Sequence, residues 1–213
     1  MLKGEPEMTA YHPSTENSRQ GTTHACRANL PVTRSISHMT VLIPEIQTAR
    51  LRLGALTFKQ LELYLAMPGQ LEPMLGVSIS RDVRTETVER AIRMKLAKMA
   101  QADEKDHAWY TYWLVIVTSR LAGAGLAGFK GVPDSEGIVE IGYGIAPAFQ
   151  GKGYTTEAAQ ALIAWAFETP ACKAVIAPHT RRSNVASNRV LQKVGMRVYA
   201  ETVEDVSWRI DKS

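Results

Sequence analysis

The segment Phe149-Gln150-Gly151-Lys152-Gly153-Tyr154-Thr155 is the most informative part of this sequence, because its two glycines stand just before Thr156-Glu157-Ala158-Ala159, which favours a helix. Glycine lets the backbone turn sharply and leaves no Cβ to obstruct an approaching group. The N–H groups of the first helical turn have no partner within a helix, and the helix dipole adds roughly half a positive charge there. The segment therefore predicts an anion cradle, most naturally for a phosphate, and Lys152 adds a cation.

Strands and helices are both predicted around this loop. The expected strands cover 51–53, 109–118, 122–127, 138–145, 174–177, 196–200 and 206–210, and the expected helices cover 57–67, 85–100, 155–168 and 184–194. Short connections containing Gly and Pro predict an antiparallel meander from 109 to 145. The crossover from Ile145 through the next helix to Ala174 predicts a parallel, right-handed connection. The fold class is therefore α/β or α+β, with a mixed sheet.

The helix expected over 85–100 has an apolar stripe and a basic remainder. Val88, Ile92, Leu96 and Met99 form the stripe, and Arg90, Arg93, Lys95 and Lys98 lie elsewhere on the helix. Such a basic face can bind an acidic partner. It is also the ordinary solvated outer face of a surface helix, which is the interpretation we expect here.

Composition excludes several classes of protein. The 213 residues include 25 Lys and Arg against 21 Asp and Glu, a net charge of +4, and 45% are hydrophobic and 22% charged, as in ordinary globular proteins. No apolar run is long enough to span a membrane, and none near the N-terminus resembles a signal peptide. Cys26 and Cys172 are too few and too isolated for a disulfide framework or a zinc site. We expect a cytoplasmic protein that binds neither metal, membrane nor nucleic acid.

Residues 1–40 differ from the remainder. They are rich in Ser, Thr, Asn, Gln and Pro and show neither the helical nor the strand period. We interpret them as a disordered N-terminal extension before a single domain at 41–213. An alternative hypothesis places the natural start at Met39.

Three sequence blocks, in this order, resemble the GNAT superfamily of acyl-CoA-dependent N-acetyltransferases, particularly its Rim-type branch that acetylates the N-termini of ribosomal proteins. They are Glu140-Ile141-Gly142-Tyr143-Gly144-Ile145, Gln150-Gly151-Lys152-Gly153-Tyr154-Thr155-Thr156-Glu157-Ala158, and Asn184-Val185-Ala186-Ser187-Asn188-Arg189-Val190-Leu191-Gln192-Lys193-Val194-Gly195-Met196. The pattern of elements from Thr48 to Asp211 also matches the family. The resemblance implies a single domain with a mostly antiparallel sheet of six to seven strands, a splayed parallel central pair and about four helices.

The resemblance also implies how acetyl-CoA is held. Backbone groups of Gln150, Gly151, Lys152, Gly153, Tyr154 and Thr155 would bind the coenzyme A pyrophosphate. Main-chain groups of Ile145 and Ala146 would pair with the pantetheine arm, and Asn184 and Asn188 would contact the coenzyme from the later helix.

Transfer of an acyl group to an amine needs a neutral amine and a stabilised oxyanion. On a regular strand, Glu140 shares one side with Gly142 and Gly144, so this carboxylate lies beside two positions without side chains. Glu140 is the candidate general base, directly or through a water. The N–H group near Ile145 is the candidate oxyanion donor.

The thiolate that leaves needs a proton, and many family members supply it from a Tyr on the last helix. Leu191 occupies that position here. Ser187, which is our candidate, Tyr154 or water would replace it, because a thiol with a pKa of about 8.5 leaves without much help. His179, near the end of a short strand, is a further residue that would face the site, although an exposed or structural role is the ordinary interpretation.

The sequence thus predicts a monomeric or homodimeric N-acetyltransferase that transfers acetyl from acetyl-CoA to a primary amine by direct attack in a ternary complex. The amine is a protein N-terminus or a small molecule. The alternative is a catalytically silent module that binds acyl-CoA, which the missing Tyr keeps open.

Overall fold

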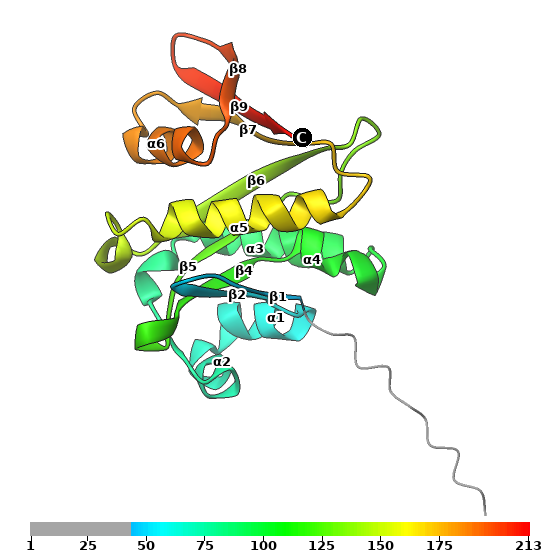
Figure 1. Ribbon diagram of the computed structural model, residues 1–213. Helices are drawn as coiled ribbons and strands as arrows, with labels where there is room; N and C mark the ends of the chain where they lie inside the picture. The colour runs from blue at the N-terminus through cyan, green and yellow to red at the C-terminus, as the bar shows by residue number, and fades with distance from the viewer. Residues whose placement is uncertain (1–43) are drawn as a thin grey trace, which may run out of the picture. The chain divides into compact units, whose positions relative to one another are not determined.

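The computed structural model describes residues 44–213 (Figure 1). The extension predicted over residues 1–40 and the alternative start at Met39 lie outside these residues. No helix between residues 44 and 213 combines the length and the apolar character needed to cross a lipid bilayer.

The described part contains one sheet of nine strands, where the sequence predicts six to seven. The strands are β1 Glu45–Gln47, β2 Leu51–Ala55, β3 Ser78–Ile79, β4 Trp113–Val117, β5 Ala122–Phe129, β6 Ile138–Ile145, β7 Ala174–Arg181, β8 Arg197–Glu201 and β9 Asp205–Asp211. Their order is β1-β2-β4-β5-β6-β7-β9-β8, and β3 pairs with β5. The two additional strands, β1 and β3, are too short to show an alternating pattern in the sequence. The mixed, mostly antiparallel fold class is confirmed.

Six α-helices accompany this sheet between residues 44 and 213, where about four are predicted. They are α1 Phe58–Ala66, α2 Pro68–Leu75, α3 Glu86–Met99, α4 His107–Tyr110, α5 Tyr154–Glu168 and α6 Val185–Lys193. Thr57 and Gln60 form the capping box expected at the start of α1. The run that begins at Thr57 ends at Ala66, before Pro68 as expected, and Pro68 then begins α2, where its missing N–H breaks no hydrogen bond.

The centre of the sheet has the predicted meander and splayed pair. β4, β5 and β6 are successively antiparallel. β6 and β7 are parallel, but their pairing covers only Ile138–Glu140 opposite Ala174–Ile176. Beyond Glu140, β6 stays with β5 as far as Ile145, while β7 stays with β9. The gap between β6 and β7 therefore widens toward the loop that follows β6 (Figure 1).

The strand register assigns side chains to the two faces of the sheet. Leu114 lies opposite Leu126, which lies opposite Gly144, so the three share one face. Glu140 is on this face too, because side chains alternate along β6. Trp113 points to the other face and packs against Trp165 of α5 at 5.0 Å between ring centroids. Glu140 and α5 thus lie on opposite faces.

Two expected strands differ from the structure. The strand expected over 109–118 begins only at Trp113, because Trp109 belongs to α4. The Trp109 ring is nearly buried, 4.6 Å from the Trp165 ring, so burial overrides the strand preference of its aromatic sequence. The strand expected over 196–200 corresponds to β8, whose residues are all exposed. The apolar residues that alternate along it, such as Val198, therefore do not form a buried face.

Lys95 does not belong to the exposed basic face expected for α3. Its ammonium group donates to three backbone carbonyls, those of Tyr110 (3.0 Å), Thr111 (3.1 Å) and Phe129 (2.6 Å). These acceptors match the three N–H donors of an ammonium. Burial, and then the nearby charges of Lys98 and Lys130, lower the pKa of Lys95 to about 7. Lys95 therefore ties α3 to the ends of α4 and β5.

We expect Lys95→Met to lower the free energy of unfolding by about 2–4 kcal/mol, because three carbonyls would lose their donor in a buried place. Urea denaturation measures the change. Lys98→Met is the matched control, because the exposed Lys98 side chain donates to one carbonyl, that of Lys130, at 2.9 Å, and should change stability by less than about 0.5 kcal/mol. Equal losses in the two variants would contradict the structural role of Lys95.

Candidate active site

The loop after β6 has the backbone that its glycines predict. The chain makes a short 3₁₀ turn over Pro147–Phe149 and then passes through Gly151 at φ +73° and Gly153 at φ +79°. Only glycine adopts this left-handed region without strain from a Cβ. Gly153 is also the N-cap of α5 and has no side chain to bond the amides of the first turn.

Six consecutive backbone amides at this loop are unpaired within the described part of the chain. The first helical hydrogen bond of α5 joins the Glu157 N–H to the Gly153 carbonyl, at 3.1 Å. The preceding N–H groups, from Gly151 to Thr156, have no acceptor in residues 44–213. The Gln150 N–H, predicted to belong with them, instead donates to the Pro147 carbonyl. The cradle thus begins one residue later than expected.

A cavity of about 590 Å³ opens at these amides. Its lining comes from the end of β6, the loop, the start of α5, and α6: Tyr143, Gly144, Ile145, Phe149, Gln150, Gly151, Gly153, Tyr154, Thr155, Thr156, Asn184, Ala186, Ser187, Arg189, Val190 and Lys193. Arg189 and Lys193 stand one turn apart on α6 and bring two cations to the cavity. The sequence analysis missed both, because neither lies three or four residues from Asn184 or Ser187.

Three residues expected at the coenzyme, Ala146, Lys152 and Asn188, lie outside the cavity lining. The Lys152 ammonium turns back and donates to the Ala148 carbonyl at 2.8 Å. The Asn188 side chain accepts a hydrogen bond from the Trp208 indole N–H at 2.9 Å and donates to two backbone carbonyls. Asn184 does line the cavity, and its carboxamide oxygen caps α6 by accepting from the Ser187 N–H.

The edge of β6 that faces the gap presents main-chain groups. The Ala146 N–H donates to the Ala124 carbonyl at 2.8 Å, and the Glu140 carbonyl also accepts a bond from the β5 side. Because backbone groups alternate between the two edges of a strand, Tyr143 and Ile145 direct theirs toward the gap, beyond the last pair with β7. The Ile145 main chain therefore faces the gap, where its carbonyl accepts from the Gln150 side-chain amide at 3.3 Å. Ala146 is fully buried, with its amide already bonded.

A pair of hydroxyl groups lies in the same cavity. The Tyr143 hydroxyl is 3.1 Å from the Ser187 hydroxyl, and both residues line the cavity. Burial raises the pKa of Tyr143, with the Ser187 hydrogen bond opposing this in part, so Tyr143 stays protonated at neutral pH. Leu191, at the position where the resembling family carries Tyr, is buried. The sequence analysis named Ser187 and missed Tyr143.

Glu140 lies at the edge of an open strip on the face opposite α5. Its carboxylate pairs with the Lys130 ammonium, and its side chain is 25% exposed. Along the strand, a Cβ built on Gly142 or Gly144 would meet no atom within 4 Å. The strip beside Glu140 is thus bare of side chains, as the alternation of β6 predicts.

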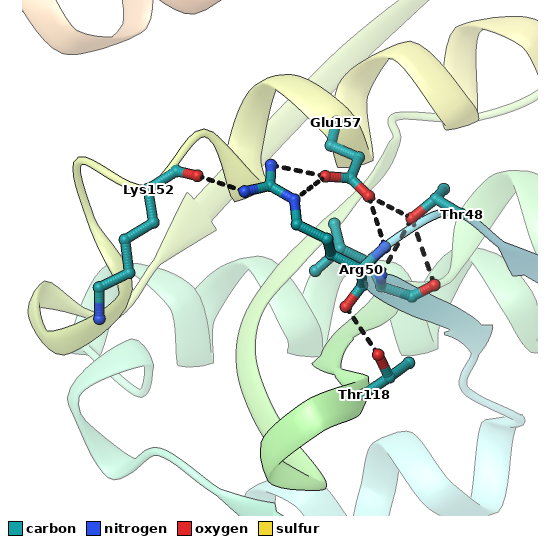
Figure 2. A network of polar contacts seen from close by, with 6 residues as sticks. Thr48, Arg50, Thr118, Lys152 and Glu157 are labelled. Atoms are coloured by element: carbon teal, nitrogen blue, oxygen red, sulfur yellow. Dashed lines mark hydrogen bonds and ion pairs between the residues drawn. The ribbon is translucent and has the colours of Figure 1, made fainter.

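Figure 2 shows a clamp that fixes the loop to β2. The Arg50 guanidinium donates to the Lys152 carbonyl at 2.9 Å and forms an ion pair of 2.6 Å with Glu157 on the first turn of α5. The Glu157 carboxylate also accepts from the Thr48 hydroxyl at 2.6 Å and from the Arg50 N–H at 2.9 Å. Partial burial raises the pKa of Glu157, but the hydrogen bonds from Thr48 and Arg50 outweigh it and hold the pKa below its usual value.

No group of three His, Cys, Asp or Glu side chains in residues 44–213 is placed to hold a metal ion. His179 lies exposed at the bulge of β7, with φ +51°, and does not line the cavity at the loop. The polar groups of the candidate site are therefore the loop amides, the two hydroxyls, the carboxylate and the cations of α6.

Comparisons with known proteins agree with this geometry. The uncharacterized N-acetyltransferase YjdG of Bacillus subtilis is 31% identical over 96 residues, which are 45% of this chain and 56% of that protein. The match thus spans just over half the length of that relative. A GNAT-family acetyltransferase from Bacillus anthracis has a similar fold, with a TM-score of 0.53, 23% identity, and coverage of 79% of this chain and 98% of that chain.

The ribosomal-protein L7/L12 N-acetyltransferase RimL, solved with coenzyme A, is also similar, with a TM-score of 0.55, 16% identity, and coverage of 79% of this chain and 98% of that chain. The Rim-type resemblance is thereby supported at the level of the fold. A family model described as an acetyltransferase (GNAT) domain matches residues 50–197, more than half of the chain. The chain belongs to the GNAT acetyltransferase family.

Proposed function

We propose that this protein is an N-acetyltransferase that transfers acetyl from acetyl-CoA to a primary amine by direct attack in a ternary complex. One observation carries the proposal, the row of six amides at the start of α5 that have no acceptor in residues 44–213, beside the gap between β6 and β7. Such a row stabilises the charge of a diphosphate, and the adjoining strand edge suits an extended amide-bearing arm.

Acetyl-CoA fits the groups present in this cavity. The amides from Gly151 to Thr156 and the cations of Arg189 and Lys193 are suited to the phosphates. The backbone of Tyr143 and Ile145 offers donors and acceptors to the pantetheine amides. The complex of RimL with coenzyme A supports this choice of co-substrate. Acetyl-CoA brings an acyl carbon activated as a thioester.

Glu140 is the proposed general base. Only a neutral amine attacks, and an α-amino group, with a pKa of about 7.7 to 8.0, loses its proton more readily than a lysine side chain, with a pKa of about 10.4. Lys130 pairs with one oxygen of the Glu140 carboxylate, which leaves the other oxygen to accept the proton, directly or through a water. The bare strip at Gly142 and Gly144 gives the amine access.

Ser187 is the proposed proton donor to the leaving group. As the amine nitrogen bonds to the acyl carbon, the carbon–sulfur bond breaks and the sulfur leaves as a thiolate. The Ser187 hydroxyl would give it a proton while taking one from the Tyr143 hydroxyl at 3.1 Å, and solvent would then return a proton to Tyr143. A thiol with a pKa of about 8.5 is a good leaving group, so this donor contributes less than the base.

Glu140→Gln tests the proposed base. We expect the rate to fall mainly at low pH, where most of the acceptor amine is protonated, by about 100-fold near pH 6. Thiol release from acetyl-CoA over a pH series measures this. Glu136→Gln, an exposed residue in the connection before β6, is the control. If Glu140 serves only as the partner of Lys130, the variant will lose stability while the shape of its pH–rate profile stays that of the wild type.

A catalytically silent module that binds acyl-CoA is the second candidate function. The observation that favours it is the buried Leu191 at the position where many family members carry the acidic Tyr. Thiol release with a pool of peptide N-termini, polyamines, amino acids and aminoglycosides separates the two functions. If the protein binds acetyl-CoA but releases no thiol with any of these acceptors, the silent module is favoured.

A further inference from the structure

A second cavity, of about 350 Å³, lies away from the loop, between α1, α2 and the segment that follows β3. Its lining includes the guanidinium side chains of Arg81 and Arg84 and the carboxylate of Glu72. Arg81 is exposed and has no acidic partner among residues 44–213. Arg84 donates through Nε to Glu89 at 2.7 Å. Glu72 accepts the Ile79 N–H at 2.7 Å through one oxygen.

Tyr64 gives this cavity an unusual donor. Its side chain is 2% exposed, and its hydroxyl is the one buried side-chain polar atom in the described residues with no hydrogen-bond partner. Burial raises the pKa of Tyr64 to about 12, although the Arg84 charge opposes this, so the hydroxyl remains a donor at neutral pH. A buried donor without a hydrogen-bond partner destabilises the fold unless some group accepts a hydrogen bond from it. The phenol therefore needs an acceptor from outside residues 44–213.

The start of α2 adds a backbone donor to the same cavity. Gly69 lines the cavity, and its N–H has no acceptor in residues 44–213. The N-cap residue Met67 makes no side-chain cap, so the first turn of this eight-residue helix keeps its positive end. Two guanidinium groups, a phenol and a helix N-terminus thus line the cavity, and two carboxylates oppose them, that of Glu72 in the lining and that of Glu89 paired with Arg84.

Hydrogen bonds to β5 link this cavity to the candidate active site. The Ser80 N–H donates to the Gly123 carbonyl at 2.9 Å, and the Ala146 N–H donates to the next carbonyl, that of Ala124. The end of β3 therefore lies beside the end of β6. The side chains of Ile79 and Leu114 lie on the same side of Gly123, because a Cβ built on Gly123 would contact both. Leu114 is on the face of the sheet that also carries Glu140. The cavity and Glu140 thus open on one face.

The distance between them limits what kind of molecule reaches both. A strand rises by about 3.3 Å per residue, so the six residues from Glu140 to Ala146 span roughly 20 Å. Between them lie the bare positions Gly142 and Gly144, which leave the path along β6 open. An extended chain of several residues covers this length, and a compact amine does not.

We propose that the cavity between α1, α2 and β3 binds an anionic group, a carboxylate or a phosphate, on an extended acceptor whose amine lies near Glu140. The assignment of this acceptor rests on the proposed acetyltransferase function, whereas the anion site itself does not. Arg81 and Arg84 supply the charge, and Tyr64 and Gly69 supply neutral donors. The acceptor is thereby an acidic or phosphorylated peptide.

Calorimetry on the full chain tests the anion site. Coenzyme A is first added to saturation, so that the loop amides are occupied, and inorganic phosphate or acetate is then titrated. We expect binding that weakens about tenfold in Arg81→Ala and several-fold in Tyr64→Phe, and that is unchanged in Arg90→Ala, an exposed cation on α3 outside the cavity. Tyr64→Phe should not lower stability, because it removes an unpaired hydroxyl. Absent binding, or equal weakening in Arg90→Ala, would overturn the site.

Six-residue peptides then test the acceptor, with binding as the readout so that turnover is not required. Pairs that differ only in Asp against Asn, or in phosphoserine against Ser, at the last position distinguish a carboxylate from a phosphate. A preference of about tenfold for either charged member, lost in Arg81→Ala, supports the proposal. Equal binding within both pairs would overturn the acceptor class. Failure of coenzyme A to bind in the first step would instead count against the proposed function.

Discussion

Gly153→Asp is expected to weaken acetyl-CoA binding by at least about 100-fold, a larger effect than any other single change at the loop. Gly153 stands at φ +79° as the N-cap of α5, between amides that have no partner in residues 44–213. Aspartate would place a side chain and a negative charge where a diphosphate belongs. Repulsion between these charges, together with loss of the amide contacts, opposes binding. Calorimetry with acetyl-CoA measures the loss.

The strain of the new side chain needs its own control. Gly76→Asp provides it, because Gly76 has a similar φ of +64°, lies at the C-terminal end of α2 and has open space around a Cβ. Both variants put the same residue into the left-handed region, so both should lose stability from backbone strain. A Cβ on Gly153 would in addition lie 3.3 Å from Nη2 of Arg50, whereas one on Gly76 would meet no atom within 4 Å. Only Gly153→Asp should lose acetyl-CoA. A folded Gly153→Asp protein with the affinity of the wild type would disprove the cradle.

The conformation of this loop was predictable because its information is local. Two glycines before a helix-forming stretch determine positive φ angles and unpaired amides, whatever surrounds them. The bare face of β6 was predictable for the same reason, because alternation places Glu140 beside Gly142 and Gly144. Backbone geometry did not extend to every residue at this end of β6, because the N–H groups of Gln150 and Ala146 are already bonded to the Pro147 and Ala124 carbonyls.

Long polar side chains were the part that sequence patterns did not resolve. Lys152 and Lys95 are both cations in the sequence, yet one turns back to the Ala148 carbonyl and the other is buried against three carbonyls. Their positions depend on acceptors far away along the chain, such as Phe129 for Lys95. Asn188 is similar, because Trp208 binds its side chain from β9. Periodicity contains no information on such partners.

Arg50→Ala is expected to weaken acetyl-CoA binding by about tenfold, although Arg50 is not among the residues that line the cavity. Its guanidinium holds the Lys152 carbonyl, and so fixes the loop with its amides directed outward. A hydrogen bond from a charged group contributes about 1.5–3 kcal/mol. We expect only part of this energy to be lost from acetyl-CoA binding, because the rest is lost from the ordering of the loop in the free protein. Arg52→Ala is the control, because Arg52 lies two residues further along, on β2, and pairs with Glu45 away from the loop.

The clamp also predicts a double-mutant result. Arg50→Ala and Glu157→Gln remove two members of one network, so their effects on acetyl-CoA affinity should be far from additive, with the double variant little worse than Arg50→Ala alone. Additive losses would show that Glu157 acts on the coenzyme independently of Arg50.

The dependence of stability on pH measures how much the charge of the Glu157 carboxylate contributes to the folded state. The pKa of Glu157 is lower in the folded chain than its ordinary value of about 4.3, so the folded state binds the proton less tightly than the unfolded state does. Its contribution to stability is therefore fully present above about pH 5 and disappears as the pH falls through the folded-state pKa. The difference in unfolding free energy between the wild type and Glu157→Gln should be constant from pH 7 to 5 and shrink below pH 4. A difference that persists unchanged at pH 3 would mean that the Glu157 charge does not hold the loop, and that packing of the first turn of α5 does so instead.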